Sequence, residues 1–174
     1  MITIISCTNR IPSRSIKVAQ YYQNLLHKLG AQSQILDLSQ LPPEFLFTAL
    51  YDNTGKDPAF NKLTDLIKDS DKIVFIVPEY NGSFPGVLKA FIDGLAYPAS
   101  FKNKKGALVG ISSGAMGGSL ALSHLTDILN YLGMHVLAIK PRLPRVEGIL
   151  KDGEIKDEFL KELLETQARE FLQF

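Results

Sequence analysis

KIVFIVPEYNGSFPGVLKAFID, residues 72–93, contains a strand, a loop and a helix in succession. After Lys72 the run 73–77 is entirely apolar, which predicts a buried β-strand at 72–77. Apolar side chains then recur at helical spacing from Leu88 onward, so a helix follows the loop. A strand that is apolar on both faces and leads into a helix is typical of a parallel sheet with helices packed on either side.

The same alternation of strand and helix runs through the rest of the chain. Strands are predicted at 2–6, 33–38, 72–77, 107–111 and 135–139, and helices at 15–29, 60–67, 88–95, 121–132 and 159–171. Five such pairs indicate a doubly wound α/β fold, in which ligands bind at the carboxyl ends of the strands, beside the point where the strand order reverses. We therefore expect functional residues after the first, third and fourth strands.

Composition narrows the class of protein. The chain has 174 residues, of which 45% are apolar and 21% charged, and its formal net charge is +1. This length predicts a single domain over residues 1–174. The sequence has no basic stripe of the kind that nucleic-acid binders carry and no apolar run long enough to span a membrane. With one cysteine, Cys7, the chain suits a reducing compartment, so we expect a cytoplasmic protein without nucleic-acid or membrane partners.

The loop after the first strand combines hydroxyl groups, a guanidinium and a helix start. Thr8, Ser13 and Ser15 supply hydroxyls and Arg10 a positive charge. Unpaired N–H groups at a helix start, hydroxyl donors and an arginine suit a phosphate monoester. The alternative is an N-cap serine beside an unrelated exposed arginine. Neither a dinucleotide fingerprint nor a P-loop pattern is present.

The loops after the third and fourth strands have a different chemistry. In the 78–86 loop, Gly82 permits a tight turn, and Tyr80 and Asn81 offer an aromatic face and an amide to a flat heterocycle. The alternative is a stiff turn with its tyrosine packed on the core. The 112–119 loop is rich in glycine, which leaves backbone amides bare for an anion or an electron-rich planar edge. A flexible connector is its alternative.

These loops resemble those of the NADPH-dependent FMN reductase family of flavodoxin-like proteins, which includes quinone, azo-dye and chromate reductases. The family pattern G-[ST]-x-R-x-x-S-x-[NS] is matched by Thr8, Arg10, Ser13 and Ser15, with Cys7 in place of the glycine. The pattern P-E-Y-N-x-x-x-P-G-x-L-K-x-x-[IL]-D is matched by Pro78, Glu79, Tyr80, Asn81, Pro85, Gly86, Leu88, Lys89 and Asp93. The third pattern, S-x-G-x-x-G-G, lies at 112–118. The resemblance covers roughly residues 1–140, and nothing is transferred to residues 141–174.

The resemblance implies a flavodoxin-like three-layer sandwich, with a five-stranded parallel sheet in the order 2-1-3-4-5. It also implies FMN as the cofactor and NADPH or NADH as the electron donor. The cofactor-binding residues that it implies are Thr8, Arg10, Ser13, Ser15, Pro78, Glu79, Tyr80, Asn81, Gly82, Ser112, Ser113, Gly114 and Gly117. No catalytic side chain and no metal are expected, because FMN carries the chemistry.

The expected function is an NAD(P)H-dependent oxidoreductase that passes two electrons to FMN, quinones or similar small acceptors by ping-pong kinetics, as a homodimer or higher homo-oligomer. The alternatives are a non-enzymatic electron carrier like flavodoxin and a flavin-binding regulatory protein. Such carriers are strongly acidic, which steers them to basic partners, whereas this chain is nearly neutral.

Three further features allow two interpretations each. Cys7 is interpreted as a small apolar residue rather than a redox switch. Arg142 and Arg145 either bind the 2′-phosphate of NADPH or lie on a solvated loop. The apolar run 45–51 either covers the flavin or a partner subunit, or forms a satellite core.

Overall fold

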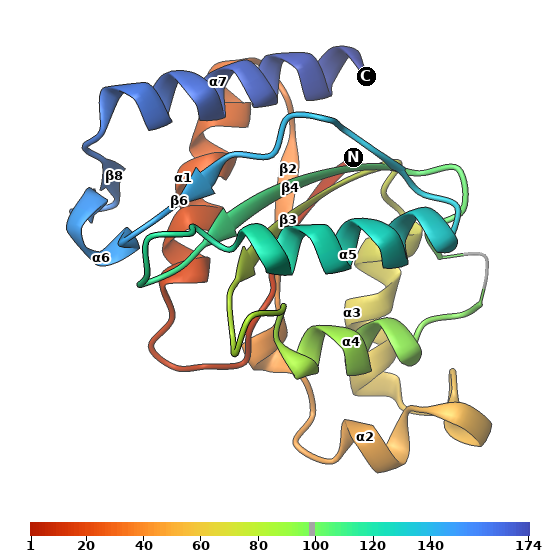
Figure 1. Cartoon of the computed structure of the whole chain (residues 1–174). Helices are drawn as coiled ribbons and strands as arrows, with labels where there is room; N and C mark the ends of the chain where they lie inside the picture. The colour runs from red at the N-terminus through yellow and green to blue at the C-terminus, as the bar shows by residue number, and fades with distance from the viewer. Residues whose placement is uncertain (98–99) are drawn as a thin grey trace.

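A computed structural model, which describes residues 1–97 and 100–174, shows a parallel sheet with helices on both faces (Figure 1). The strands of the sheet are β1 (Ile2–Ser6), β2 (Ser33–Asp37), β3 (Lys72–Pro78), β4 (Lys105–Ile111), β5 (His135–Val136) and β6 (Arg142–Leu143). Their order is β2-β1-β3-β4-β5, with β6 also paired to β4. The predicted flavodoxin-like strand order is therefore confirmed.

Helices cover both faces of this sheet. The main helices are α1 (Arg14–Lys28), α3 (Pro58–Lys68), α4 (Gly86–Asp93), α5 (Ser119–Tyr131) and α7 (Glu158–Gln173). In Figure 1, α1 and α7 lie on one face, whereas α3, α4 and α5 lie on the other. Alternate residues of the strands serve the two cores: Phe75 packs in the core under α3, α4 and α5, and Val74 in the core under α1 and α7. Both residues are fully buried, as the continuous apolar run predicted.

Side-chain caps determine where the helices begin. The hydroxyl of Ser13 accepts from the backbone N–H of Ile16 at 3.3 Å and caps α1. Asp57 caps α3, which has Pro58 in its first turn, and Asp157 caps α7. Each of these oxygens satisfies an N–H that has no partner inside its helix.

The edge strand differs from the prediction of one strand at 135–139. Lys105 pairs with His135, thirty positions later, whereas Gly110 pairs with Arg142, thirty-two positions later. The edge strand therefore carries two extra residues, and it leaves the ladder between β5 and β6. Pro141 lies in this interruption and has no N–H to donate, which is where sheets tolerate proline. We call residues 137–141 the edge bulge.

The long segment at 39–58, which lies between the second predicted strand and the helix predicted at 60–67, contains short helical turns: η1 (Leu38–Gln40), α2 (Phe45–Thr48) and η2 (Tyr51–Asn53). Phe45 and Leu50 are buried in the core under α3 and α4. The side chains of Leu46, Phe47 and Tyr51 are exposed, by 47%, 81% and 79%. The apolar run thus divides between a core contact and a solvent-exposed apolar face.

The remaining elements follow β6. They are α6 (Val146–Ile149), the antiparallel pair β7 (Leu150–Lys151) and β8 (Glu154–Ile155), and α7. The end of α7 is tied to the sheet by Lys72, whose Nζ donates to the carbonyls of Phe171 and Leu172 at 2.8 and 2.7 Å. A lysine suits this position because the last carbonyls of a helix lack partners and carry partial negative charge. Over the described residues, no helix combines the length and apolar character needed to cross a membrane.

Candidate functional site

A cavity of about 340 Å³ opens at the carboxyl edge of the sheet, between the loops after β1, β3 and β4. Nine of the residues predicted to bind the cofactor line it: Thr8, Arg10, Ser13, Ser15, Pro78, Glu79, Tyr80, Ser112 and Ser113. These residues come from segments about seventy and thirty positions apart along the chain. They meet here because parallel strands bring their carboxyl ends to one edge.

The first loop places its polar groups around the start of α1. Thr8 and Ser15 are almost completely buried, while Ser13 is partly exposed; its hydroxyl oxygen accepts the cap hydrogen bond, which leaves the O–H itself to donate to a ligand. The backbone N–H of Arg10 donates to the Thr8 hydroxyl at 3.2 Å, which folds the loop onto itself. The amides of the first turn of α1 add positive potential to the cavity wall, because they point out of the helix without intrahelical partners.

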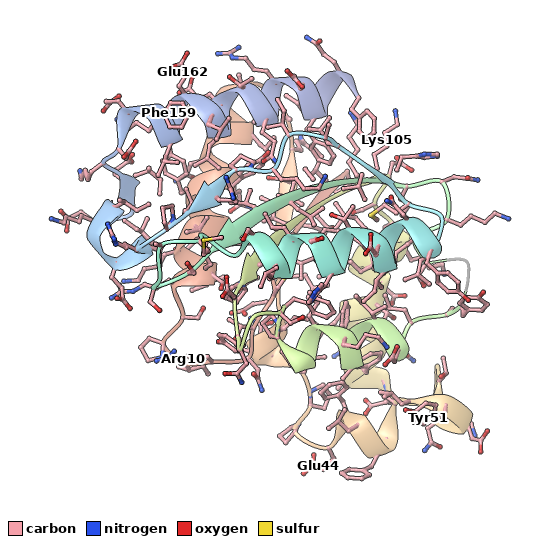
Figure 2. All side chains as sticks on the ribbon, in the orientation of Figure 1. Arg10, Glu44, Tyr51, Lys105, Phe159 and Glu162 are labelled. Carbon is pink, nitrogen blue, oxygen red and sulfur yellow. The ribbon has the colours of Figure 1, made fainter. Side chains whose placement is uncertain are left out.

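Three cations surround this helix start. Arg10, Arg14 and Lys17 all line the cavity and are exposed, and we call them the cation cluster. In the described residues the ion pairs are Lys89–Asp93 and Glu158–Lys161, so the cation cluster is not neutralised by a carboxylate. Figure 2 shows Arg10 at the outer side of the first loop. The cavity lining also contains Glu79 and Glu147, and neither forms an ion pair with these cations, so an anion that enters meets an excess of positive charge at the helix start.

Arg14 and Lys17 are not among the site residues predicted from the sequence. Their signal was present, because both follow the cap residue Ser13 within the first turn of α1 and are three positions apart, hence on one face. The family pattern of the first loop specifies Thr8, Arg10, Ser13 and Ser15; it leaves position 14 open and ends before Lys17. Pro12, which also lines the cavity, offers an apolar ring rather than a polar group.

The second loop contains a tight two-residue turn. Tyr80 and Ser83 exchange backbone hydrogen bonds at 2.8 and 3.0 Å, and both residues between them have positive φ, 52° at Asn81 and 76° at Gly82. This is the type I′ turn for which Asn-Gly is the preferred sequence. Asn81 and Gly82 do not line the cavity. They shape the loop that holds Tyr80.

Tyr80 connects the second loop to the first. Its hydroxyl lies 2.7 Å from the hydroxyl of Thr8, and either can donate. The tyrosine is therefore fixed at the cavity wall by a hydrogen bond to the first loop. Its backbone is held by the turn, and the residue lines the cavity.

Glu79 contributes a carboxylate whose two oxygens differ. Its backbone N–H donates to the carbonyl of Ile111 at 3.0 Å, which continues the pairing of β3 with β4. Its Oε2 is buried and has no hydrogen-bond partner among the described residues. Buried acceptors without a partner are rare, and each calls for an explanation such as a catalytic role or a bound water or ion. Glu79 lines the cavity, so this acceptor is available to a donor bound there.

The third loop is stiffened by Ser112. Its hydroxyl donates to the carbonyl of Gly114 at 2.9 Å and accepts from the N–H of Gly117 at 3.0 Å. Gly114 and Gly117 do not line the cavity. Gly117 has φ of 61°, and a Cβ there would lie 2.7 Å from the Cβ of Arg142, so glycine is required for close packing against β6.

Residues beyond 140 form one wall of the cavity, which sequence analysis did not predict. Val146 and Glu147, at the start of α6, both line it. The third loop is joined to this segment by three backbone hydrogen bonds, which we call the clamp. They run from Ser112 N to Leu143 O at 3.2 Å, from Arg145 N to Gly114 O at 3.0 Å and from Val146 N to Ser112 O at 3.0 Å.

The structure also places the three features that allowed two interpretations each. Cys7 is fully buried, its Sγ donates to the carbonyl of Ile5 at 3.4 Å, and burial raises the pKa of its thiol well above the usual value. A buried neutral thiol behaves as a small apolar residue, which favours that interpretation. Arg142, Arg145 and the 45–51 run lie outside the cavity lining. Within the described residues, no cluster of side chains is suited to a metal ion.

Comparison with known proteins agrees with this arrangement. The chain matches the profile of the NADPH-dependent FMN reductase family over residues 1–140. It is 29% identical over 168 residues to a 2-hydroxy-1,4-benzoquinone reductase from a Burkholderia species, which covers 91% of this chain and 86% of that protein. It is 32% identical over 146 residues to an NAD(P)H-dependent FMN reductase of Pseudomonas aeruginosa, with 83% and 74% covered.

Among solved structures, the flavoenzyme NAD(P)H:(acceptor) oxidoreductase FerB from Paracoccus denitrificans superposes with a TM-score of 0.80 at 26% identity. The superposition covers 99% of this chain and 94% of FerB. The matched profile itself extends over most of the sequence and includes the first three strands, β4 and all three loops of the cavity. The chain belongs to the NADPH-dependent FMN reductase family.

Proposed function

We propose that this oxidoreductase holds FMN in the cavity at the carboxyl edge of the sheet, with the phosphate at the start of α1, and passes two electrons from NADPH or NADH to a quinone or a similar small acceptor. The observation that carries the proposal is the cation cluster beside the first turn of α1, which forms no ion pair with a carboxylate among the described residues. A phosphate monoester supplies the missing negative charge, and helix N–H groups and hydroxyls supply its donors.

The cavity fits FMN in three respects. Its volume of about 340 Å³ falls within the range of small-molecule sites. Its positive end, at Arg10 and Ser15, suits a terminal phosphate. Its other walls present the ring of Tyr80 and the buried, unpaired Oε2 of Glu79, an acceptor that suits a ring N–H of the isoalloxazine.

When bound, FMN would supply the two-electron redox chemistry that links the nicotinamide to the acceptor. The chain binds and orients this group and need not provide a nucleophile. The hydrogen bond between Thr8 and Tyr80 keeps the first and second loops at a fixed separation. Ser112 and the clamp do the same for the third loop. A cavity that is held in shape before binding loses less conformational entropy when the ligand enters.

Substrate use is proposed to follow ping-pong kinetics. The nicotinamide and a quinone are both flat, and both must reach the same reacting edge of the cofactor. They therefore occupy the site in turn. The acceptor class rests on relatives that act on quinones, among them the 2-hydroxy-1,4-benzoquinone reductase.

Homodimer formation is proposed from the exposed apolar face of the segment that carries α2 and η2. Leu46, Phe47 and Tyr51 present their side chains to solvent, and contiguous exposed apolar surface usually marks an interaction site. Figure 2 shows Tyr51 and Glu44 on this segment, at the end of the molecule away from α7.

The test is anaerobic stopped-flow spectroscopy of the FMN-loaded protein. Addition of NADPH or NADH should bleach the flavin band, and a quinone added afterwards should restore it. Parallel lines in double-reciprocal plots should accompany this behaviour. If neither nucleotide bleaches the band, the proposal of catalytic turnover is wrong, and the carrier or regulatory alternative takes its place.

A further inference from the structure

A single buried amide on α7 reaches the sheet at the place where the edge strand is interrupted. Gln167 is fully buried, and its Nε2 donates to the carbonyls of Leu108 and Ile139, both at 2.9 Å. Its Oε1 accepts from the hydroxyl of Tyr22 on α1 at 3.0 Å. Burial raises the pKa of Tyr22, so the hydroxyl keeps its proton and remains a donor.

The two carbonyls that Gln167 binds are those that the edge bulge affects. Leu137 N donates to Gly106 O at 2.8 Å, and Gly110 N donates to Pro141 O at 2.9 Å, so the ladder is intact on both sides of Leu108. In an uninterrupted parallel strand, a backbone N–H from the edge would donate to Leu108 O. Here the side chain of Gln167 takes that place and also holds the bulge through Ile139 O.

The edge bulge leads directly into the clamp. Residues 142–146 follow it without a break, and they carry the three backbone bonds that fix the third loop, together with the wall formed by Val146 and Glu147. If the backbone of the edge bulge moves, β6 moves with it, and the clamp residues move with β6. Because a protein interior is close-packed, such a shift cannot be absorbed within the bulge alone.

We propose that Gln167 is a positioning residue for the cofactor site: it holds the edge bulge in register and thereby keeps the clamp and the third loop in place. The inference rests on the proposed function for the assignment of the cavity to FMN. It gives a role to the chain beyond residue 140, which the family match does not reach.

The experiment measures hydrogen exchange at the backbone amides of the clamp, Ser112, Arg145 and Val146, in the protein without FMN. Gln167→Met keeps the length of the side chain and removes its donors. These three amides should exchange about tenfold faster or more, relative to amides of β1 and β3. Affinity for FMN, titrated by fluorescence quenching, should fall about fivefold or more. Tyr22→Phe is the matched control, because it breaks the same network but leaves both donors of the amide on their carbonyls; it should leave the clamp protected.

A second variant keeps the test decisive if Gln167→Met does not fold. Gln167→Asn retains the amide, but its shorter side chain cannot reach Tyr22 and both carbonyls together, so the same three amides should exchange faster. Unchanged exchange at the clamp in either folded variant overturns the proposal. Faster exchange with unaltered FMN affinity also overturns it, because the clamp would then not serve the cofactor. Arg10→Ala, which does not touch the clamp, tests the proposed function separately.

Discussion

Replacement of Arg10 by alanine tests whether the start of α1 binds the phosphate of FMN. Arg10 lines the cavity and has no carboxylate partner in the part of the chain that the structure describes, so its removal leaves no buried charge unpaired there. A hydrogen bond to a charged group contributes about 1.5–3 kcal/mol. Arg10 is exposed, and Arg14 and Lys17 remain beside the phosphate, so we expect the low end of this range. A loss of about 1.5 kcal/mol corresponds to roughly tenfold weaker binding.

The assay is a fluorescence-quenching titration of the apoprotein with FMN and, in parallel, with riboflavin. Wild-type protein should bind FMN more tightly than riboflavin, because riboflavin lacks the phosphate. Arg10→Ala should reduce this preference about tenfold and leave riboflavin affinity unchanged. Higher ionic strength should reduce the difference between FMN and riboflavin affinity, because the cation cluster is exposed and is screened by salt.

The matched control is Arg169→Ala, which removes the same charge from an exposed position on α7 that does not line the cavity. It should change neither affinity. Equal losses for FMN and riboflavin in Arg10→Ala would show that the loop had been disturbed rather than a phosphate contact removed. An equal effect of Arg169→Ala would mean that net charge, and not position, governs binding. Either result would refute the phosphate assignment.

The remaining predictions concern the second loop and the exposed apolar face. Gly82→Val should lower the free energy of unfolding by about 1–2 kcal/mol, because a non-glycine residue is strained at φ of 76°. It should also weaken FMN binding in a quenching titration. Gly148→Val, whose Cβ meets open space, should not weaken FMN binding. Tyr80→Phe should lower the free energy of unfolding in urea by about 0.5–1.5 kcal/mol through loss of the bond to Thr8, and an unchanged midpoint would contradict that tie. Phe47→Glu should convert a dimer into a monomer of about 19.3 kDa in light scattering; a wild-type protein that is already monomeric at micromolar concentration would rule out the dimer.

Much of the fold could be predicted because its signals are local. The run 73–77 is apolar at every position, and each residue has a covered face of the sheet to occupy. Three polar or glycine-bearing loops followed three such strands, and the parallel arrangement brought them to one edge. Gly82 was predicted to permit a tight turn, and the structure has one there, with positive φ at Asn81 and Gly82. In each case the residues that decide the structure lie within a few positions of one another.

What could not be predicted depends on contacts between distant segments. The break in the edge strand contains Pro141 and is bridged by the amide of Gln167, which is twenty-eight positions from its partner Ile139. The hydrophobic periodicity of the sequence does not indicate such a hydrogen bond. The wall formed by Val146 and Glu147 has the same origin, because the clamp that places it is made of backbone groups, which carry no sequence signature.

The polar groups of the cavity divide into two sets, and the division predicts how variants will separate. Thr8, Tyr80 and Ser112 spend their hydroxyls on one another or on neighbouring backbone, so they hold the loops in shape. The cation cluster and Oε2 of Glu79 have no such partners among the described residues, so they are available to a ligand. Changes in the first set alter the cavity as a whole and should weaken FMN and riboflavin alike. Changes in the cation cluster should weaken FMN alone, and a change at Glu79 should weaken both while leaving the preference for phosphate intact. If the two ligands fail to separate the sets in this way, the phosphate end and the ring end of the cavity have been assigned incorrectly.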